Sequence, residues 1–175
     1  MSPINNNFKN NHHIKCIKGI KSNLVDNTLI NELYILYKEY SNKSYTIYEN
    51  LNINTFKKTF TNNAFTHFII YRDNIIISYI SMFKLDTLYN NTTLYTSGFL
   101  YYMFFKYDSL LINSFELISE HIYIHKIYDL ITFGDIFNIN YNDIKCIAGS
   151  SLSKYYLFNL KSSKIEAYKN ALITI

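Results

Sequence analysis

Only four glycines and one proline interrupt the 175 residues of this chain. Glycine and proline are the residues that most often end helices and strands, so their scarcity predicts long regular segments. It also excludes collagen-like chains, linker-rich chains and sites that need several glycines to cradle a phosphate.

The composition is that of a folded protein with one domain. Apolar residues make up 49% of the chain, aromatic residues 18% and charged residues 17%, whereas disordered chains combine low hydrophobicity with high charge. A chain of this length buries a substantial core as one domain. The N-terminus is rich in Asn and His, so we expect a disordered tail over residues 1–13 and one domain over residues 14–175.

The charge pattern gives no support for nucleic-acid binding. The net charge is +4 at pH 7, but an AT-rich genome favours lysine codons, and the lysines are scattered along the chain. The densest groups are Lys57 with Lys58, and Lys161, Lys164 and Lys169. We interpret both groups as solvated faces.

Cysteine and histidine positions argue against a disulfide framework and against a metal site. Cys16 and Cys146 are too far apart for metal-ligand spacing, and two thiols do not make a disulfide scaffold. His121 and His125 lie one helical turn apart without a third ligand, so we interpret them as a pair on a helix surface. No stretch reaches the roughly 18 apolar residues of a membrane-spanning helix. We expect a cytoplasmic protein without a transmembrane segment.

Apolar periodicity predicts a mixture of strands and helices. The expected strands are at residues 14–20, 45–48, 65–71, 75–83, 94–105, 128–133 and 155–160, and the expected helices at residues 27–41, 54–60 and 110–125. Asp26 is expected to cap the first helix, and Asp108 with Ser109 the last. Residues 72–74 have hairpin turn chemistry, and Gly98 predicts either a bulge or a close approach to the backbone.

The order of these elements predicts an α+β fold, with a mixed sheet flanked by helices. It resembles the acyl-CoA N-acyltransferase-like (acetyltransferase-like) fold, in which a glycine-rich loop opens a helix and its backbone amides bind the pyrophosphate of the acyl-CoA. Here residues 105–109 contain no glycine, and Asp108 would repel a phosphate. The chain therefore has the element order of such a domain without its phosphate-binding loop.

Several segments are similar to one family. Residues 155–160, YYLFNL, are close to the YYLYNW motif of N-myristoyltransferase, and residues 81–85, SMFKL, are similar to its SFYTL. Residues 94–102 and residues 110–111 are similar to its LKAAYSFY and LLDLMNDAL segments. From about residue 18 to residue 175, the chain resembles the C-terminal half of that enzyme, the glycylpeptide N-tetradecanoyltransferase.

The resemblance implies a catalytic role for the C-terminus. The family fuses two acetyltransferase-like halves: the first binds myristoyl-CoA, and the second supplies most of the peptide groove and a catalytic terminal carboxylate. Ile175 falls at that position, so its carboxylate is expected to be the general base that deprotonates the N-terminal glycine of a protein. The last five residues are apolar, and burial would make this carboxylate a stronger base. The alternative is an edge strand whose carboxylate still reaches water.

The resemblance also assigns residues that bind the peptide substrate. Phe99 corresponds to the groove aromatic of the family, and Thr87 to a groove-lining serine. Gly149, Ser150 and Ser151 belong to the segment KCIAGSS over residues 145–151, which stands where the family has KFGxGDG. Ser150 replaces the acidic residue that favours basic substrates. From the residues alone, this segment predicts a turn and not a nucleophilic serine.

Thr174 is also expected to contact the substrate. The chain alone is expected to hold no cofactor, because myristoyl-CoA, the co-substrate, would be bound by a partner. That partner is expected to be an acyl-CoA-binding half or a second copy of the chain, since aromatic surface would otherwise stay exposed.

Two functions remain open. The first is the peptide-binding and general-base half of a split N-myristoyltransferase, which the apolar C-terminus favours. The second is a catalytically silent, N-myristoyltransferase-like module that binds a peptide or a partner, which the altered KFGxGDG signature favours. A stand-alone acetyltransferase is the weakest candidate because the phosphate-binding loop is absent.

Overall fold

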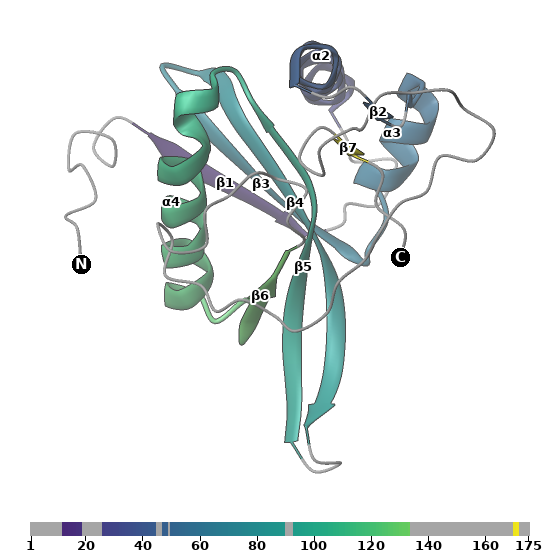
Figure 1. Ribbon diagram of the computed structural model, residues 1–175. Coiled ribbons are helices and arrows are strands. Elements are labelled where there is room, and N and C mark those ends of the chain that lie inside the picture. Colours follow the sequence, from purple (N-terminus) through teal and green to yellow (C-terminus); the bar gives the residue numbers. More distant parts are fainter. Residues whose placement is uncertain are drawn as a thin grey trace.

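The computed structural model describes residues 12–18, 26–44, 47–48, 50–89, 93–133 and 170–171. Its helices and strands follow the chain in the order β1 (His13–Lys18), α2 (Asn27–Ser44), β2 (Ile47–Tyr48), α3 (Ile53–Phe60), β3 (Phe65–Arg72), β4 (Ile75–Tyr89), β5 (Thr93–Phe105), the 3-10 turn η2 (Asp108–Leu110), α4 (Leu111–Ile124), β6 (Leu130–Thr132) and β7 (Asn170–Ala171) (Figure 1). The expected strand at residues 155–160 lies outside the described residues.

The main sheet has five strands in the order β1-β3-β4-β5-β6. The first four strands run antiparallel to their neighbours, and β6 runs parallel to β5. β2 and β7 form a separate two-stranded parallel pair. Asp73 and Asn74, which both have positive φ angles of 51° and 62°, join β3 to β4 in a tight hairpin turn, as their residue types predict. The mixed sheet with flanking helices confirms the expected α+β fold.

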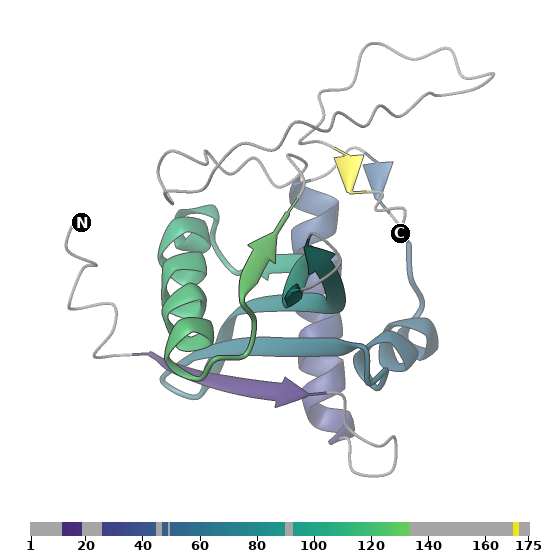
Figure 2. The same cartoon turned by 90° about the horizontal axis from the view of Figure 1, so that it is seen from below.

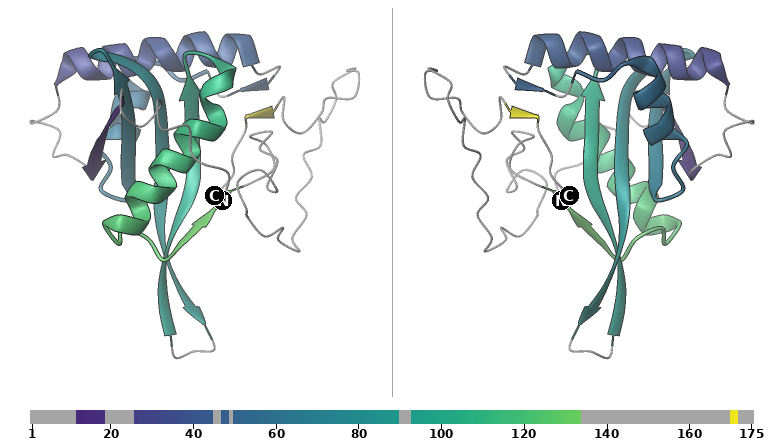
Figure 3. Two further views of the ribbon diagram at one scale, coloured as in Figure 1. Left: turned by 90° about the vertical axis from the view of Figure 1, so that its left-hand side faces the viewer. Right: turned by 90° about the vertical axis from the view of Figure 1, so that its right-hand side faces the viewer.

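Helices cover both faces of the sheet (Figure 2; Figure 3). On one face, Phe56 of α3 lies between Tyr37 of α2 and Tyr79 of β4, with ring centroids 5.5 and 6.3 Å away. On the other face, His121 of α4 packs edge-on against Phe68 of β3 at 6.2 Å. The apolar faces that the periodicity predicted for these helices therefore meet the sheet. None of the helices in the described part of the chain is long and apolar enough to span a membrane.

Helix capping follows the sequence at α2 but not at α4. The Asp26 carboxylate accepts the N–H of Thr28 at 2.8 Å, as expected of an N-cap. At α4, the expected capping by Asp108 and Ser109 is wrong, because both lie in the 3-10 turn that precedes Leu111, and no side chain caps the first turn of the helix. A tighter turn often precedes an α-helix and moves a capping candidate out of register.

The β4–β5 hairpin is longer than expected. Its strands pair from Ser78 with Phe105 as far as Tyr89 with Thr93, whereas the pairing of β4 with β3 ends at Phe83. We call residues 84–89 and 93–98 the arm. Figure 1 and Figure 3 show the arm projecting beyond both helical layers.

Candidate functional site

In the described chain, β6 pairs with only part of β5, and we call the edge of β5 beyond that pairing the opening. β6 pairs with β5 only over Ser97–Phe99, and no described strand pairs with that edge of β5 over residues 100–105. A strand edge without a pairing partner has backbone groups that can bind an extended ligand. This edge is the centre of the candidate site.

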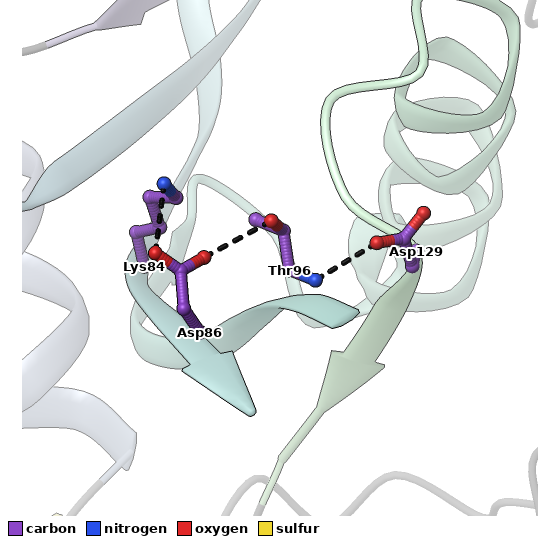
Figure 4. Close-up of polar contacts among 4 residues, drawn as sticks. All are labelled: Lys84, Asp86, Thr96 and Asp129. Carbon is purple, nitrogen blue, oxygen red and sulfur yellow. Dashed lines mark hydrogen bonds and ion pairs between the residues drawn. The ribbon is translucent and has the colours of Figure 1, made fainter. Parts of the chain in front are cut away.

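A chain of polar contacts anchors β6 at the closed end of the opening. The backbone N–H of Asp129 donates to the Thr96 carbonyl, and the Asp129 carboxylate accepts the Thr96 N–H, both at 2.8 Å. The Thr96 hydroxyl donates to Asp86 Oδ1 at 3.0 Å, and Lys84 Nζ lies 3.1 Å from Asp86 Oδ2 (Figure 4). Hydrogen bonds from Lys84 and Thr96 lower the pKa of Asp86. Sequence reasoning missed this cluster, although the alternation of Lys84 and Asp86 in a strand places both on one face.

Gly98 lies against the ring of Tyr128, a residue that comes just before β6 in the chain. A Cβ at Gly98 would stand 2.6 Å from Tyr128 Cδ2 and 3.1 Å from Met82 Sδ. The expected close approach is therefore confirmed. Burial raises the pKa of the Tyr128 hydroxyl.

The bulge of β5 lies three residues further on, at Tyr101. Ser81 pairs with Tyr102, but the next residue of β4, Met82, pairs with Leu100, so Tyr101 is the extra residue. An extra residue turns its own backbone groups out of the ladder. The bulge lies just beyond residues 97–99, the part of β5 that pairs with β6.

Phe99 lies where the sheet begins to open. It pairs with Phe83 of β4 and with Thr132 of β6, and its side chain is half-buried. Thr87 lies on the same hairpin, opposite Tyr95. Four strand residues separate the two positions on β4, or about 13 Å. Phe99 and Thr87 are therefore on one hairpin but not side by side.

The remaining expected site residues, Gly149, Ser150, Ser151, Thr174 and Ile175, lie outside the described residues.

The loop between β5 and α4 does not fit the pyrophosphate of an acyl-CoA. It contains no glycine, and its amides at Lys106 and Leu110 donate to the carbonyls of Ile77 and Tyr107. The Asp108 carboxylate stands at the start of the turn, 3.4 Å from Lys43 Nζ. An anion site at a helix N-terminus needs free N–H donors and no negative side chain.

Besides His12 and His13 at the N-terminal end of β1, the described chain has histidines at two places. The rings of His121 and His125 lie 4.3 Å apart at the end of α4, but no three His, Cys, Asp or Glu residues of the described ranges lie together as a metal site would require. His67 is fully buried, with Nδ1 2.9 Å from the Tyr79 hydroxyl. Burial lowers the pKa of His67 to about 4.

No protein-family model matches the sequence, and no curated protein matches it. Solved structures do. An aminoglycoside acetyltransferase from an uncultured soil metagenomic sample, in complex with sisomicin, has a TM-score of 0.57 at 12% identity, over 88% of this chain and 99% of its own. The ribosomal-protein-alanine N-acetyltransferase of Brucella melitensis biovar Abortus 2308 has a TM-score of 0.57 at 8% identity, over 85% and 99%. A GNAT family acetyltransferase of Staphylococcus aureus has a TM-score of 0.54 at 13% identity, over 84% and 99%.

The chain has the GNAT acetyltransferase fold. The acyl-CoA N-acyltransferase-like fold predicted from the order of elements is thereby confirmed. At these identities the likeness is one of fold, so the activity has to be argued from the site.

Proposed function

We propose that this chain is the peptide-binding and general-base half of a split N-myristoyltransferase, which transfers myristate from myristoyl-CoA to the N-terminal glycine of a protein. The observation that carries the proposal is the loop after β5. The GNAT fold is present, but this loop has no glycine, and Asp108 stands at its helix-forming end. A domain that keeps the acyltransferase fold and lacks a phosphate-binding loop fits the second half of a two-half enzyme.

The C-terminal carboxylate is the proposed base. A free α-amino group has a pKa of about 8 and is mostly protonated at neutral pH. In the proposed reaction, the Ile175 carboxylate takes one proton from the glycine ammonium, and the resulting amine attacks the thioester carbonyl of the myristoyl-CoA that the partner half holds. The amide C–N bond forms as the C–S bond breaks, and CoA leaves as the thiol with a second proton from the amine. Deprotonation by a positioned base makes the amine nucleophilic at neutral pH.

The peptide is proposed to bind along the β4–β5 hairpin. Phe99 supports this, because its ring is half-exposed at the opening of the sheet and lies beside Phe83. Thr87, further along the same hairpin, would contact a later residue of the peptide. Residues 149–151 and Thr174 complete the proposed substrate site.

A catalytically silent module is the second candidate. The segment KCIAGSS at residues 145–151 keeps only a lysine and one glycine of the family signature KFGxGDG. A chain that binds a peptide without acylating it would tolerate these changes.

Reconstitution tests the proposal. The chain is mixed with a polypeptide that binds myristoyl-CoA and resembles the first half of the family, and transfer of labelled myristate to a Gly-initiated peptide is measured. We expect transfer by the pair and none by this chain alone, with an Ala-initiated peptide as the control. Turnover by the purified chain alone would contradict the split enzyme, and peptide binding without transfer by the pair would favour the silent module.

A further inference from the structure

The arm and the adjoining part of the sheet have two faces of different character. Side chains alternate between the faces of a strand, so Lys84 and Asp86 share one face with Thr96, which pairs with Asp86 in the hairpin. We call this the charged face. The opposite face, which we call the uncharged face, includes the apolar and aromatic residues Phe83, Leu85, Tyr95, Phe99, Tyr101 and Leu130, together with the hydroxyl residues Ser97 and Thr132. No charged residue of β4, β5 or β6 lies on the uncharged face.

The uncharged face is exposed to solvent at its outer end. The exposed fractions are 38% for Leu85, 36% for Tyr95 and 51% for Leu130. At its inner end the face joins the core, because the ring of Phe65 lies 5.3 Å from Phe83 and 5.0 Å from Tyr101. An exposed apolar surface that is continuous with a packed core is typical of a binding site.

The distribution of charge indicates which side chains of a ligand the uncharged face would bind. On the charged face, which lies opposite the uncharged face, the Asp86 carboxylate is already bound by Lys84 and Thr96. A lysine or arginine of a ligand would therefore lose hydration over the uncharged face and find no carboxylate there. An apolar side chain would instead gain free energy by leaving water.

Strand edges next to this face favour an extended ligand. In the described chain, β4 has no strand partner on its β3 side beyond Lys84, whose N–H donates to the Ala64 carbonyl at 2.8 Å. An extended peptide pairs with such an edge through its main chain, while alternate side chains lie on the face.

We propose that the uncharged face binds the residues that follow the N-terminal glycine of the peptide substrate, and that it selects apolar or aromatic side chains over lysine and arginine. This inference rests on the proposed function, whose peptide site it specifies.

The test uses the full chain and Gly-initiated octapeptides that differ only in carrying Leu or Lys at one position from 2 to 7. Calorimetry measures the dissociation constant of each peptide. We expect at least one position at which the Leu peptide binds about tenfold more tightly than the Lys peptide, as burial of a leucine side chain allows. Equal or tighter binding of the Lys peptides at every position, or no binding of any peptide, would overturn the proposal.

Two matched variants test whether the peptide binds on the uncharged face. Leu85→Lys puts a cation on the uncharged face, and Leu94→Lys puts one on the opposite face of the same arm, where Leu94 is 60% exposed. We expect Leu85→Lys to weaken binding of the Leu peptide about tenfold and Leu94→Lys to leave it unchanged. Equal effects of the two substitutions would contradict the assignment, as would self-association through this face that excludes the peptide.

Different results would contradict the proposed function and this inference. If the octapeptides bind with the expected preference but the reconstituted pair transfers no myristate, the silent module is favoured and the uncharged face keeps its role. If the pair acylates Lys and Leu peptides with equal kcat/KM, the enzyme stands and the selectivity is wrong.

Discussion

At Gly98 the absence of a side chain is required by a neighbour and not by the backbone angles. Its strand geometry is regular, and the constraint is the ring of Tyr128, which occupies the space that a Cβ would need. The sequence showed that Gly98 interrupts a long apolar run, but it could not show that Tyr128 lies above it, since 30 residues separate the two.

We expect Gly98→Ala to destabilise the protein by about 1–3 kcal/mol, because the added methyl group would overlap the Tyr128 ring. Urea unfolding followed by circular dichroism measures the change. The double variant Gly98→Ala with Tyr128→Leu should recover part of the loss, since the smaller side chain leaves room. An unchanged unfolding midpoint for Gly98→Ala would show that the ring moves aside at no cost.

His67 makes the stability of the fold depend on pH. Burial lowers the pKa of His67 from 6.5 to about 4, so the folded state favours the neutral ring more strongly than the unfolded chain does. Its contribution is complete above pH 6.5 and is lost as the pH falls toward 4. We expect a loss of up to about 3 kcal/mol of unfolding free energy over this interval.

Replacing the histidine isolates this effect from the titration of carboxylates. In His67→Gln, urea unfolding between pH 7 and pH 4.5 should show a smaller pH dependence than in the wild type. The variant is expected to be less stable than the wild type at pH 7, since the ring stacks on Phe60 at 4.4 Å. Parallel pH profiles for the two proteins would mean that His67 does not titrate as described.

At the scale of the elements, the sequence predicted most of the described strands and helices. Alternation and three-to-four spacing locate the elements, because each buries one apolar face. The prediction was wrong at the end of β4. The charged residues Lys84 and Asp86 are expected from the sequence to lie beyond the end of the strand. They instead continue it on a solvated face. A polar pattern in an exposed arm resembles a loop, and only the partner strand distinguishes the two.

Asp129 anchors β6 to β5, and its removal tests that attachment. In Asp129→Ala, the Thr96 N–H loses its acceptor, so we expect a loss of about 1 kcal/mol. Amide exchange of Gly98 and Ile131 should accelerate, while amides of β3 keep their protection. Asp86→Ala is the matched control, because it removes a carboxylate of the same cluster that does not bind β6. Equal acceleration in both variants would contradict the anchoring role.

At the scale of the whole molecule, less of the candidate site could be predicted. The resemblance selected Phe99, which lies at the opening of the sheet, but its role in peptide binding stays a prediction. The absence of glycine after β5 was visible in the sequence. The Asp129 contacts and the uncharged face were not, because both depend on which strands become neighbours. Strand order is a property of the folded chain that local patterns do not encode.

The proposed general base belongs to the end of the chain, so changes there test the whole assembly. Adding a few residues after Ile175 should lower acyl transfer by the reconstituted pair roughly 10²–10⁴-fold, as expected for loss of a general base. Ile175→Val should have a mild effect, because it keeps the carboxylate. Deleting Thr174 and Ile175 should be severe, since the new terminus would stop about 7 Å short. An extended chain that keeps the full rate would refute Ile175 as the base.

The order of strands in the sheet also has a kinetic consequence. Short turns join β3, β4 and β5, which are successive antiparallel neighbours. In contrast, α2 and α3 lie between β1 and its partner β3 in the chain, and α4 lies between β5 and β6. Closing short loops costs less entropy than closing long ones, and parallel pairing needs a crossover. The three-stranded meander should therefore form early during folding and β6 attach late. Until β6 attaches to residues 97–99, the outer edge of β5 has no neighbour in the described chain. A chain halted before this step therefore exposes a longer strand edge, which can pair with a wrong strand.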